Sequence, residues 1–278
     1  MKIDTSIALM GLIIAAAAFF GIDKWISYRV DLIIQRKYEQ IDKFKQLLID
    51  SIVLKTKLTD LTNLQLEIKF LSRDKDMVNE TLIKQSECSQ AADVLVPQLI
   101  ALFKEGAEVK VISETKRLIE ELFRVSVNLL YIQKKYQAIN QLQEYGDYYD
   151  LGYVIWAYFS VTNMVLYLGN MQSVFKDKAI MASQKATELL PDYGTPVAVR
   201  LIINMVDFKT TGDEQYKKQA GELIQNVNSA NSVNLPLEIL NYLERSRSYE
   251  DVWKYIDLLF KTFPDQMIAM KNKSIQSY

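Results

Sequence analysis

The side chains best suited to proton transfer are two sets of neighbouring carboxylates, Glu120 with Glu121 and Asp147 with Asp150. Paired carboxylates act as general acid and base when a substrate lies between them. Adjacent residues of a helix point in different directions, so Glu120 and Glu121 are typical of a solvated helix face. Asp147 and Asp150 are typical of turns and helix caps. Neither set predicts catalysis.

The chain contains no histidine and one cysteine, Cys88. Without histidine, serine and cysteine triads of the usual kind, most zinc and copper sites, and di-iron sites built on Glu-x-x-His are excluded. Cys88 has no histidine to activate it and no second cysteine to pair with. The sequence also lacks a phosphate-binding loop and a dinucleotide fingerprint. We therefore expect no enzyme, no cofactor and no metal site; an enzyme would need a carboxylate pair assembled from distant helices.

The charges are nearly balanced, with 33 basic and 34 acidic residues and a net charge of −1. Such a chain has no overall positive field to hold a polyanion, so nucleic acid is not an expected partner. Its apolar fraction of 49% is sufficient for a packed core.

The most apolar segment runs from Ile7 to Ile22 without a charge, between Asp4 and Asp23. The stretch from Thr5 to Ile22 would rise about 27 Å as a helix, close to the thickness of a bilayer core. We expect an uncleaved single-pass anchor over residues 1-23, with lipid-facing and interfacial residues Ile7, Leu9, Leu12, Ile13, Ile14, Phe19, Phe20, Trp25 and Tyr28. A cleaved signal peptide and a buried core helix are the alternatives for this segment.

The basic residues near the anchor are unevenly distributed. Lys2 alone precedes it, whereas Lys24, Arg29, Arg36 and Lys37 follow it. Because basic flanks favour the cytoplasmic side, we expect the C-terminal body in the cytoplasm, with the opposite topology as the alternative.

Low glycine and proline content predicts an all-α protein: an N-terminal single-pass transmembrane helix followed by a helical bundle and α-hairpin repeats. In residues 24-146, apolar residues from Ile26 to Ile52 recur at helical spacing, which indicates a long amphipathic stalk helix that packs on another helix of the same chain. Further helices are expected over residues 89–104 and 113–144, separated by Gly106. Apolar and polar residues alternate over residues 64–70 and, more weakly, over residues 109–111. This pattern leaves a small two-stranded element as an alternative to helix at these positions.

Residues 147-278 open with a dense aromatic cluster, and no charge occurs from Leu151 to Phe175. We expect a helix buried on most sides, with a second membrane span as the alternative. A third interpretation is an aromatic docking patch for a protein partner, to which the candidate residues Tyr148, Tyr149, Tyr153 and Trp156 would belong.

In the last third of the chain, the small residues Ala179 and Ala186 lie in a segment with helical character that ends at Pro191. Pro264 ends a second segment of this kind. These residues resemble the second helix of a tetratricopeptide repeat (TPR), and Leu166 stands where the first helix of that motif carries a leucine. Three TPR-like helical hairpins are expected from about Leu151 onward, the second formed by residues 196–208 and 213–227 and the third by residues 235–245 and 249–263.

The resemblance implies a curved stack with a concave groove that binds a protein segment, and no catalysis. Helix facing then suggests four groove residues, Asn163, Arg200, Asn204 and Asp207. The expected function is a membrane-anchored helical scaffold, or adaptor, that holds a protein partner at the bilayer. The alternative is a structural or signalling subunit of a larger membrane complex, such as a transport or secretion complex, with Leu151–Phe175 embedded in the membrane.

Overall fold

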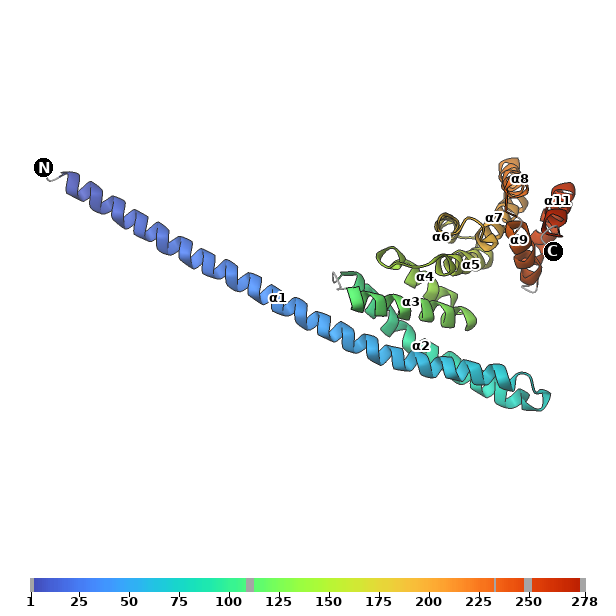
Figure 1. Ribbon diagram of the computed structural model, residues 1–278, viewed down its shortest axis with the longest axis horizontal. Coiled ribbons are helices and arrows are strands. Elements are labelled where there is room, and N and C mark those ends of the chain that lie inside the picture. The colour runs from blue at the N-terminus through green and yellow to red at the C-terminus, as the bar shows by residue number, and fades with distance from the viewer. Residues whose placement is uncertain (1–2, 109–112, 233, 248–251, 276–278) are drawn as a thin grey trace.

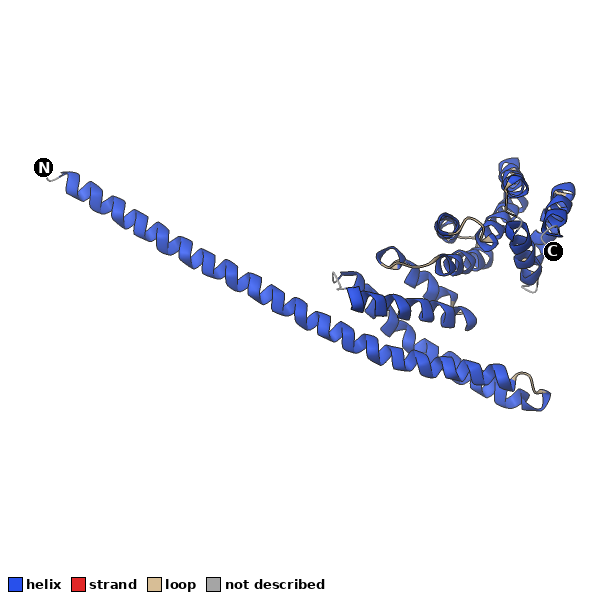
Figure 2. Cartoon of the chain, viewed as in Figure 1, coloured by secondary structure: helices blue, strands red, loops and turns tan. Residues whose placement is uncertain are grey.

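The computed structural model describes the backbone of residues 3–108, 113–232, 234–247 and 252–275. Side chains are described from Tyr28 onward within these ranges, except at residues 37, 75, 113 and 114. The described chain contains eleven α-helices, two short 3-10 helices and no strand, which confirms the all-α prediction (Figure 2).

The longest element is α1 (Ile3–Leu71), which forms an antiparallel hairpin with α2 (Val78–Glu108) through the 3-10 helix η1 (Lys75–Met77). The buried residues among the described side chains of α1 are Leu47, Ser51, Leu54, Leu58 and Leu61; they recur every three or four positions and therefore face α2 and α3 along one side. Residues 64–70 lie within α1, so they form helix and not a strand. Residues 109–111, where the weaker alternation occurs, lie outside the described part of the chain.

The N-terminal part of α1 projects away from the other helices (Figure 1). Among the described side chains from Tyr28 to Gln46, none is buried. The predicted anchor side chains from Ile7 to Trp25 lie outside the described ones, and Tyr28 is exposed. Where side chains are described, no helix has both the length and the apolar character required to cross a membrane.

After α2, the chain forms α3 (Ser113–Ile132), α4 (Tyr136–Gln143) and the 3-10 helix η2 (Gly146–Tyr148). The prediction of one helix over residues 113–144 was wrong, because Lys134 adopts a left-handed conformation with φ of 55° and ends α3. Gly106 does not separate two helices either. It lies inside α2, where a Cβ atom would come within 2.6 Å of the Tyr149 hydroxyl oxygen.

The next four helices, α5 (Tyr153–Asn170), α6 (Ser173–Leu189), α7 (Gly194–Thr211) and α8 (Glu214–Ser229), pack as successive neighbours. Small, completely buried residues of α6 let α5 and α7 approach this helix closely; they are Ala179, Ala182, Ser183 and Ala186. Met171, with φ of 56°, breaks the segment Leu151–Phe175 between α5 and α6, so no single helix extends across it.

The last helices are α9 (Asn234–Ser246), α10 (Trp253–Thr262) and α11 (Pro264–Ile275). The expected third hairpin, α9 with α10, is not the packing observed. Instead, α9 contacts α7 and α11, whereas α10 lies mainly on α7. Pro264, expected to close a repeat, is the first residue of α11, a position that suits proline because no helical hydrogen bond is lost there.

Candidate functional site

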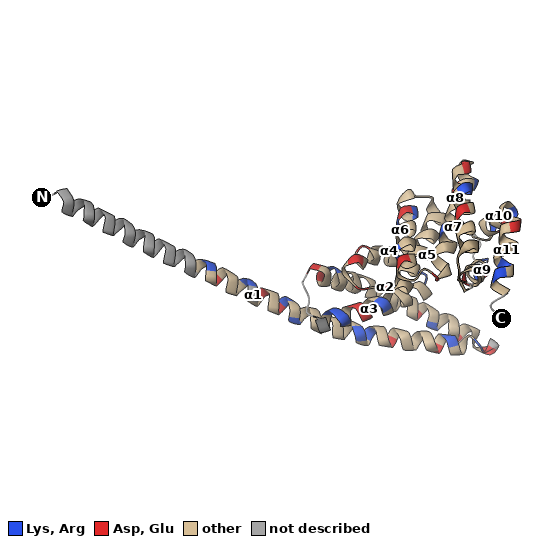
Figure 3. Cartoon of the chain, turned by 45° about the horizontal axis from the view of Figure 1, so that its top comes forward, with Lys and Arg blue, Asp and Glu red and all other residues tan. Residues whose placement is uncertain are grey.

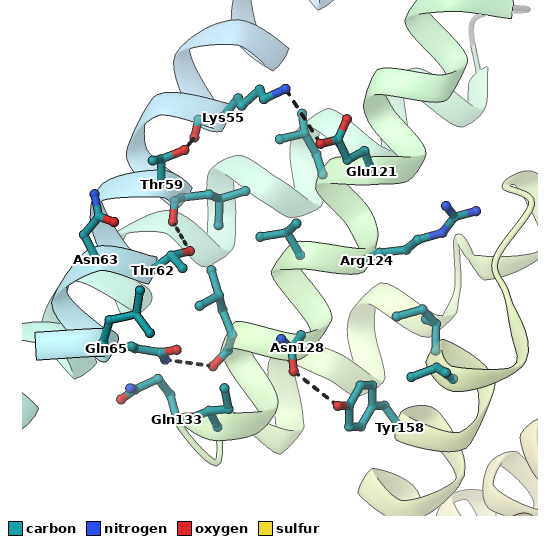
Figure 4. Close-up of a pocket in the computed structure, with 18 of the residues that line it drawn as sticks. Lys55, Thr59, Thr62, Asn63, Gln65, Glu121, Arg124, Asn128, Gln133 and Tyr158 are labelled. Atoms are coloured by element: carbon teal, nitrogen blue, oxygen red, sulfur yellow. Dashed lines mark hydrogen bonds and ion pairs between the residues drawn. The ribbon is translucent and has the colours of Figure 1, made fainter. Parts of the chain in front are cut away.

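A groove of about 1450 Å³ lies between α1 and α3 (Figure 4). The start of α5, from Gly152 to Ile155, borders it on a third side, and α2 contributes Gln85. We refer to this cavity as the α1/α3 groove.

Two rows of side chains form the walls of the α1/α3 groove. Both rows follow the spacing i, i+4, i+7, i+11, which keeps side chains on one face of a helix. The α1 row consists of Lys55, Thr59, Thr62, Leu66 and Lys69, and the α3 row consists of Glu121, Val125, Asn128 and Ile132.

The floor of the groove is apolar and belongs to the protein core. Leu58, Leu122, Leu129 and Ile155 line it and are at most 4% exposed. Above the floor, Leu66, Val125, Ile132 and Val154 are between 36% and 56% exposed. Apolar side chains that remain open to solvent over a buried apolar floor are typical of a surface that receives another apolar chain segment.

Hydrogen bonds and one ion pair connect residues of the groove walls (Figure 4). The Gln65 Nε2 of α1 donates to the Leu129 carbonyl of α3 at 3.5 Å, and Lys55 pairs with Glu121 across the groove at 3.7 Å. On the α5 side, the Tyr158 hydroxyl donates to Asn128 Oδ1 at 3.2 Å. The groove is therefore formed before any partner arrives.

Cys88 lies beside the groove and is buried. Gln133, which lines the groove, donates to Cys88 Sγ at 3.2 Å, and burial raises the pKa of the Cys88 thiol, which favours the unreactive protonated form. In the described chain, no cluster of histidine, cysteine or carboxylate side chains is arranged to hold a metal ion.

The carboxylates singled out in the sequence do not converge. Glu120 accepts a hydrogen bond from the Asp150 backbone N–H at 2.9 Å, whereas Glu121 faces Lys55. Asp147 pairs with Lys185 of α6. The carboxylates of Glu120, Glu121 and Asp147 therefore each contact another part of the fold.

Two of the four aromatic residues proposed as a docking patch are part of the core. Trp156 is 5% exposed and Tyr149 is 7% exposed, whereas Tyr148 is 60% exposed. The Tyr149 hydroxyl donates to the Phe103 carbonyl of α2 at 2.7 Å, and burial raises the pKa of Tyr149. Only Tyr153 borders the α1/α3 groove, so these four residues do not form one surface.

The four residues predicted to line a C-terminal groove lie away from the α1/α3 groove. Asn163 is fully buried and donates to the Gln143 Oε1 at 2.5 Å. Asp207 is also buried, where it accepts a hydrogen bond from Tyr167 and pairs with Lys176 at 3.3 Å. Neither is available to a partner in this conformation.

Arg200 and Asn204 of α7 are half-buried. Burial lowers the pKa of Arg200, whose Nη2 lies 3.4 Å from Thr187 Oγ1. The two residues share one face of α7, and neither lines the α1/α3 groove.

Comparison of the chain with known protein families, curated proteins and solved structures finds no match.

Sequence reasoning did not identify the α1/α3 groove. Its walls lie more than fifty positions apart in the chain, and only packing brings them together. A signal was nevertheless present, because Leu66 interrupts an otherwise polar row of α1, and Val125 and Ile132 alternate with polar residues in the row of α3. An apolar residue on a polar helix face marks a second contact surface.

Proposed function

We propose that this protein is a non-enzymatic helical adaptor that binds a segment of a protein partner in the α1/α3 groove and holds it at a membrane. In this proposal, residues 1-23 anchor the chain in the bilayer and the helical body lies in the cytoplasm. The helix pairs α5 with α6 and α7 with α8 serve as TPR-like supports.

The observation that carries the proposal is the preformed groove with its exposed apolar side chains. Val125 and Ile132 of α3 face Leu66 of α1 over a buried apolar floor. Covering such side chains removes apolar area from water, which stabilises a complex without any reactive residue. The cavity volume exceeds that of a usual small-molecule pocket and suits a chain segment.

The second support is the length of α1. From residue 23 to Leu47, the first buried residue among the described side chains of α1, a helix rises about 36 Å. A rigid helix of this length would hold the groove at a defined distance from the bilayer. Confinement to that layer raises the effective concentration of a bound partner for other membrane proteins, which is how an adaptor without enzymatic activity acts.

Site-specific photo-crosslinking in native membranes tests the groove. A benzophenone amino acid is placed at Ile132, which is 56% exposed, or at the control position Ile268 of α11, which is 58% exposed. The proposal predicts a discrete protein adduct from Ile132 that is missing from Ile268. Equal labelling at both positions, or no adduct at Ile132, would refute it.

Deletion of residues 1-23 tests the tether separately. The full chain is expected in the membrane pellet after a high-salt wash, and the shortened chain in the supernatant. A shortened chain that remains in the washed pellet would show that this segment is not the anchor.

A further inference from the structure

The charges that line the α1/α3 groove are strongly biased. Four of its charged side chains are cationic, namely Lys55, Lys69, Arg124 and Lys134, and one, Glu121, is acidic. The lining therefore has an excess of three positive charges, whereas the whole chain has a net charge of −1. The Lys and Arg positions are blue along α1 and α3 in Figure 3.

Most of this positive charge is not neutralised within the described chain. Glu121 is matched by Lys55 at 3.7 Å. Arg124 donates to the Asp150 carbonyl at 2.6 Å, a contact that fixes the guanidinium without cancelling its charge. Lys69 and Lys134 form no ion pair with any residue that the structure describes, so their ammonium groups are free for a partner's carboxylates.

The geometry of the walls specifies the shape of the occupant. Two helix faces with matching i, i+4, i+7, i+11 rows leave a channel into which a third helix can pack. The α1 row from Lys55 to Lys69 rises about 21 Å, which matches about 14 residues of helix. An apolar stripe on that helix would meet Leu66, Val125 and Ile132, and its flanks would meet the cations.

We propose that the partner segment of the α1/α3 groove is an acidic amphipathic helix, with aliphatic residues at helical spacing and Asp or Glu on both sides of that stripe. The proposal rests on the adaptor function above and specifies the chemistry of what the adaptor binds. Charge complementarity selects this partner, because a basic or neutral amphipathic helix would leave the groove cations uncompensated.

A second copy of this chain is the obvious competitor, since the projecting part of α1 exposes Val30, Ile34 and Ile41. Residues 28–46 of α1, however, contain five basic residues and three acidic ones. That segment is itself net positive, so the groove would repel it. The acidic helix is therefore the better fit.

Fluorescence anisotropy of the full chain in detergent micelles tests the proposal with two labelled peptides of about 15 residues. Both carry the same leucine stripe, and the flanks are glutamate in one and lysine in the other. At low salt, the glutamate peptide is expected to bind at least about tenfold more tightly. The double variant Lys69→Glu with Lys134→Glu should reverse this order, whereas Lys261→Glu on α10, an exposed control, should leave it unchanged.

Ile132→Glu should weaken binding of the glutamate peptide at least about tenfold, and the matched variant Ile268→Glu should not. Equal binding of the two peptides, or no binding of either, would overturn the acidic-helix assignment.

Mass-spectrometric mapping of the Ile132 adduct separates this proposal from the adaptor function. An acidic amphipathic segment supports both. An adduct with a segment of another protein that is not acidic and amphipathic would support the adaptor function and refute the acidic helix. An adduct with residues 28–46 of a second copy would refute both and show that the groove is a self-association site. Absence of an adduct removes the adaptor function itself.

Discussion

Asp207→Asn is expected to loosen the junction of three helices. Asp207 lies on α7 and is 4% exposed. One of its carboxylate oxygens accepts the Tyr167 hydroxyl of α5, and the other lies 3.3 Å from the Lys176 ammonium of α6. Asn preserves the volume of the side chain and an acceptor for Tyr167, but it turns an amide N–H toward the lysine charge.

The magnitude follows from the geometry. Two unit charges 3.3 Å apart attract each other by about 5 kcal/mol at an effective dielectric constant of about 20. Burial of both ions offsets a large part of this attraction, while Asn leaves Lys176 without a counter-ion in a site where its side chain is 21% exposed. We expect a loss of about 2–3 kcal/mol in the free energy of unfolding, equivalent to about 5–10 °C in the midpoint.

Thermal unfolding of the full chain in detergent, followed by circular dichroism, measures this loss. Asp192→Asn, an exposed carboxylate between α6 and α7, is the control and should change the free energy by less than about 0.5 kcal/mol. In a double-mutant cycle with Lys176→Met, the two losses should not add, because they remove the same interaction. Equal effects of Asp207→Asn and Asp192→Asn would refute this account of the junction.

Three further predictions follow from the fold. Burial alone would lower the pKa of Lys176, but Asp207 raises it above the ordinary 10.5. The stability from the pair is therefore present below pH 10.5 and is lost as pH rises through the higher folded pKa. The free energy of unfolding should fall more steeply with alkaline pH in the wild type than in Asp207→Asn. Ala186→Leu should cost about 1–3 kcal/mol by overpacking the fully buried face of α6, whereas Gln184→Leu on its exposed face should be nearly neutral in the same thermal assay. Cys88 is fully buried, so a thiol reagent should label it at least about 100-fold faster in denaturant than in the native protein, and equal rates would contradict its burial.

The helical class of the protein could be predicted from the sequence because helix is encoded locally. Few glycines and prolines, together with apolar residues at helical spacing, favour helices wherever the chain packs. The boundaries were harder to predict. Lys134 and Met171 end helices in a left-handed conformation that neither residue type signals, whereas Gly212, which ends α7 with φ of 72°, has the expected side chain.

The candidate site could not be predicted, because it depends on which helices become neighbours. Tyr149 and Trp156 were candidates for a docking patch as exposed aromatics, but α2, α3 and α6 cover them in the fold. Asp207 was predicted to line a groove, but in the fold it contacts Lys176 and Tyr167, which belong to two other helices. In both cases, helices that are distant in the sequence bury the side chain. Periodicity along one helix cannot predict that burial.

The most direct test of the adaptor account is photo-crosslinking from Ile132 in native membranes, with Ile268 as the matched control. The account predicts one partner adduct at Ile132 that disappears with Val125→Glu, a second substitution in the same groove, and no adduct at Ile268. Persistence of the Ile132 adduct with Val125→Glu, or the same adducts from both positions, would contradict a binding site in the α1/α3 groove.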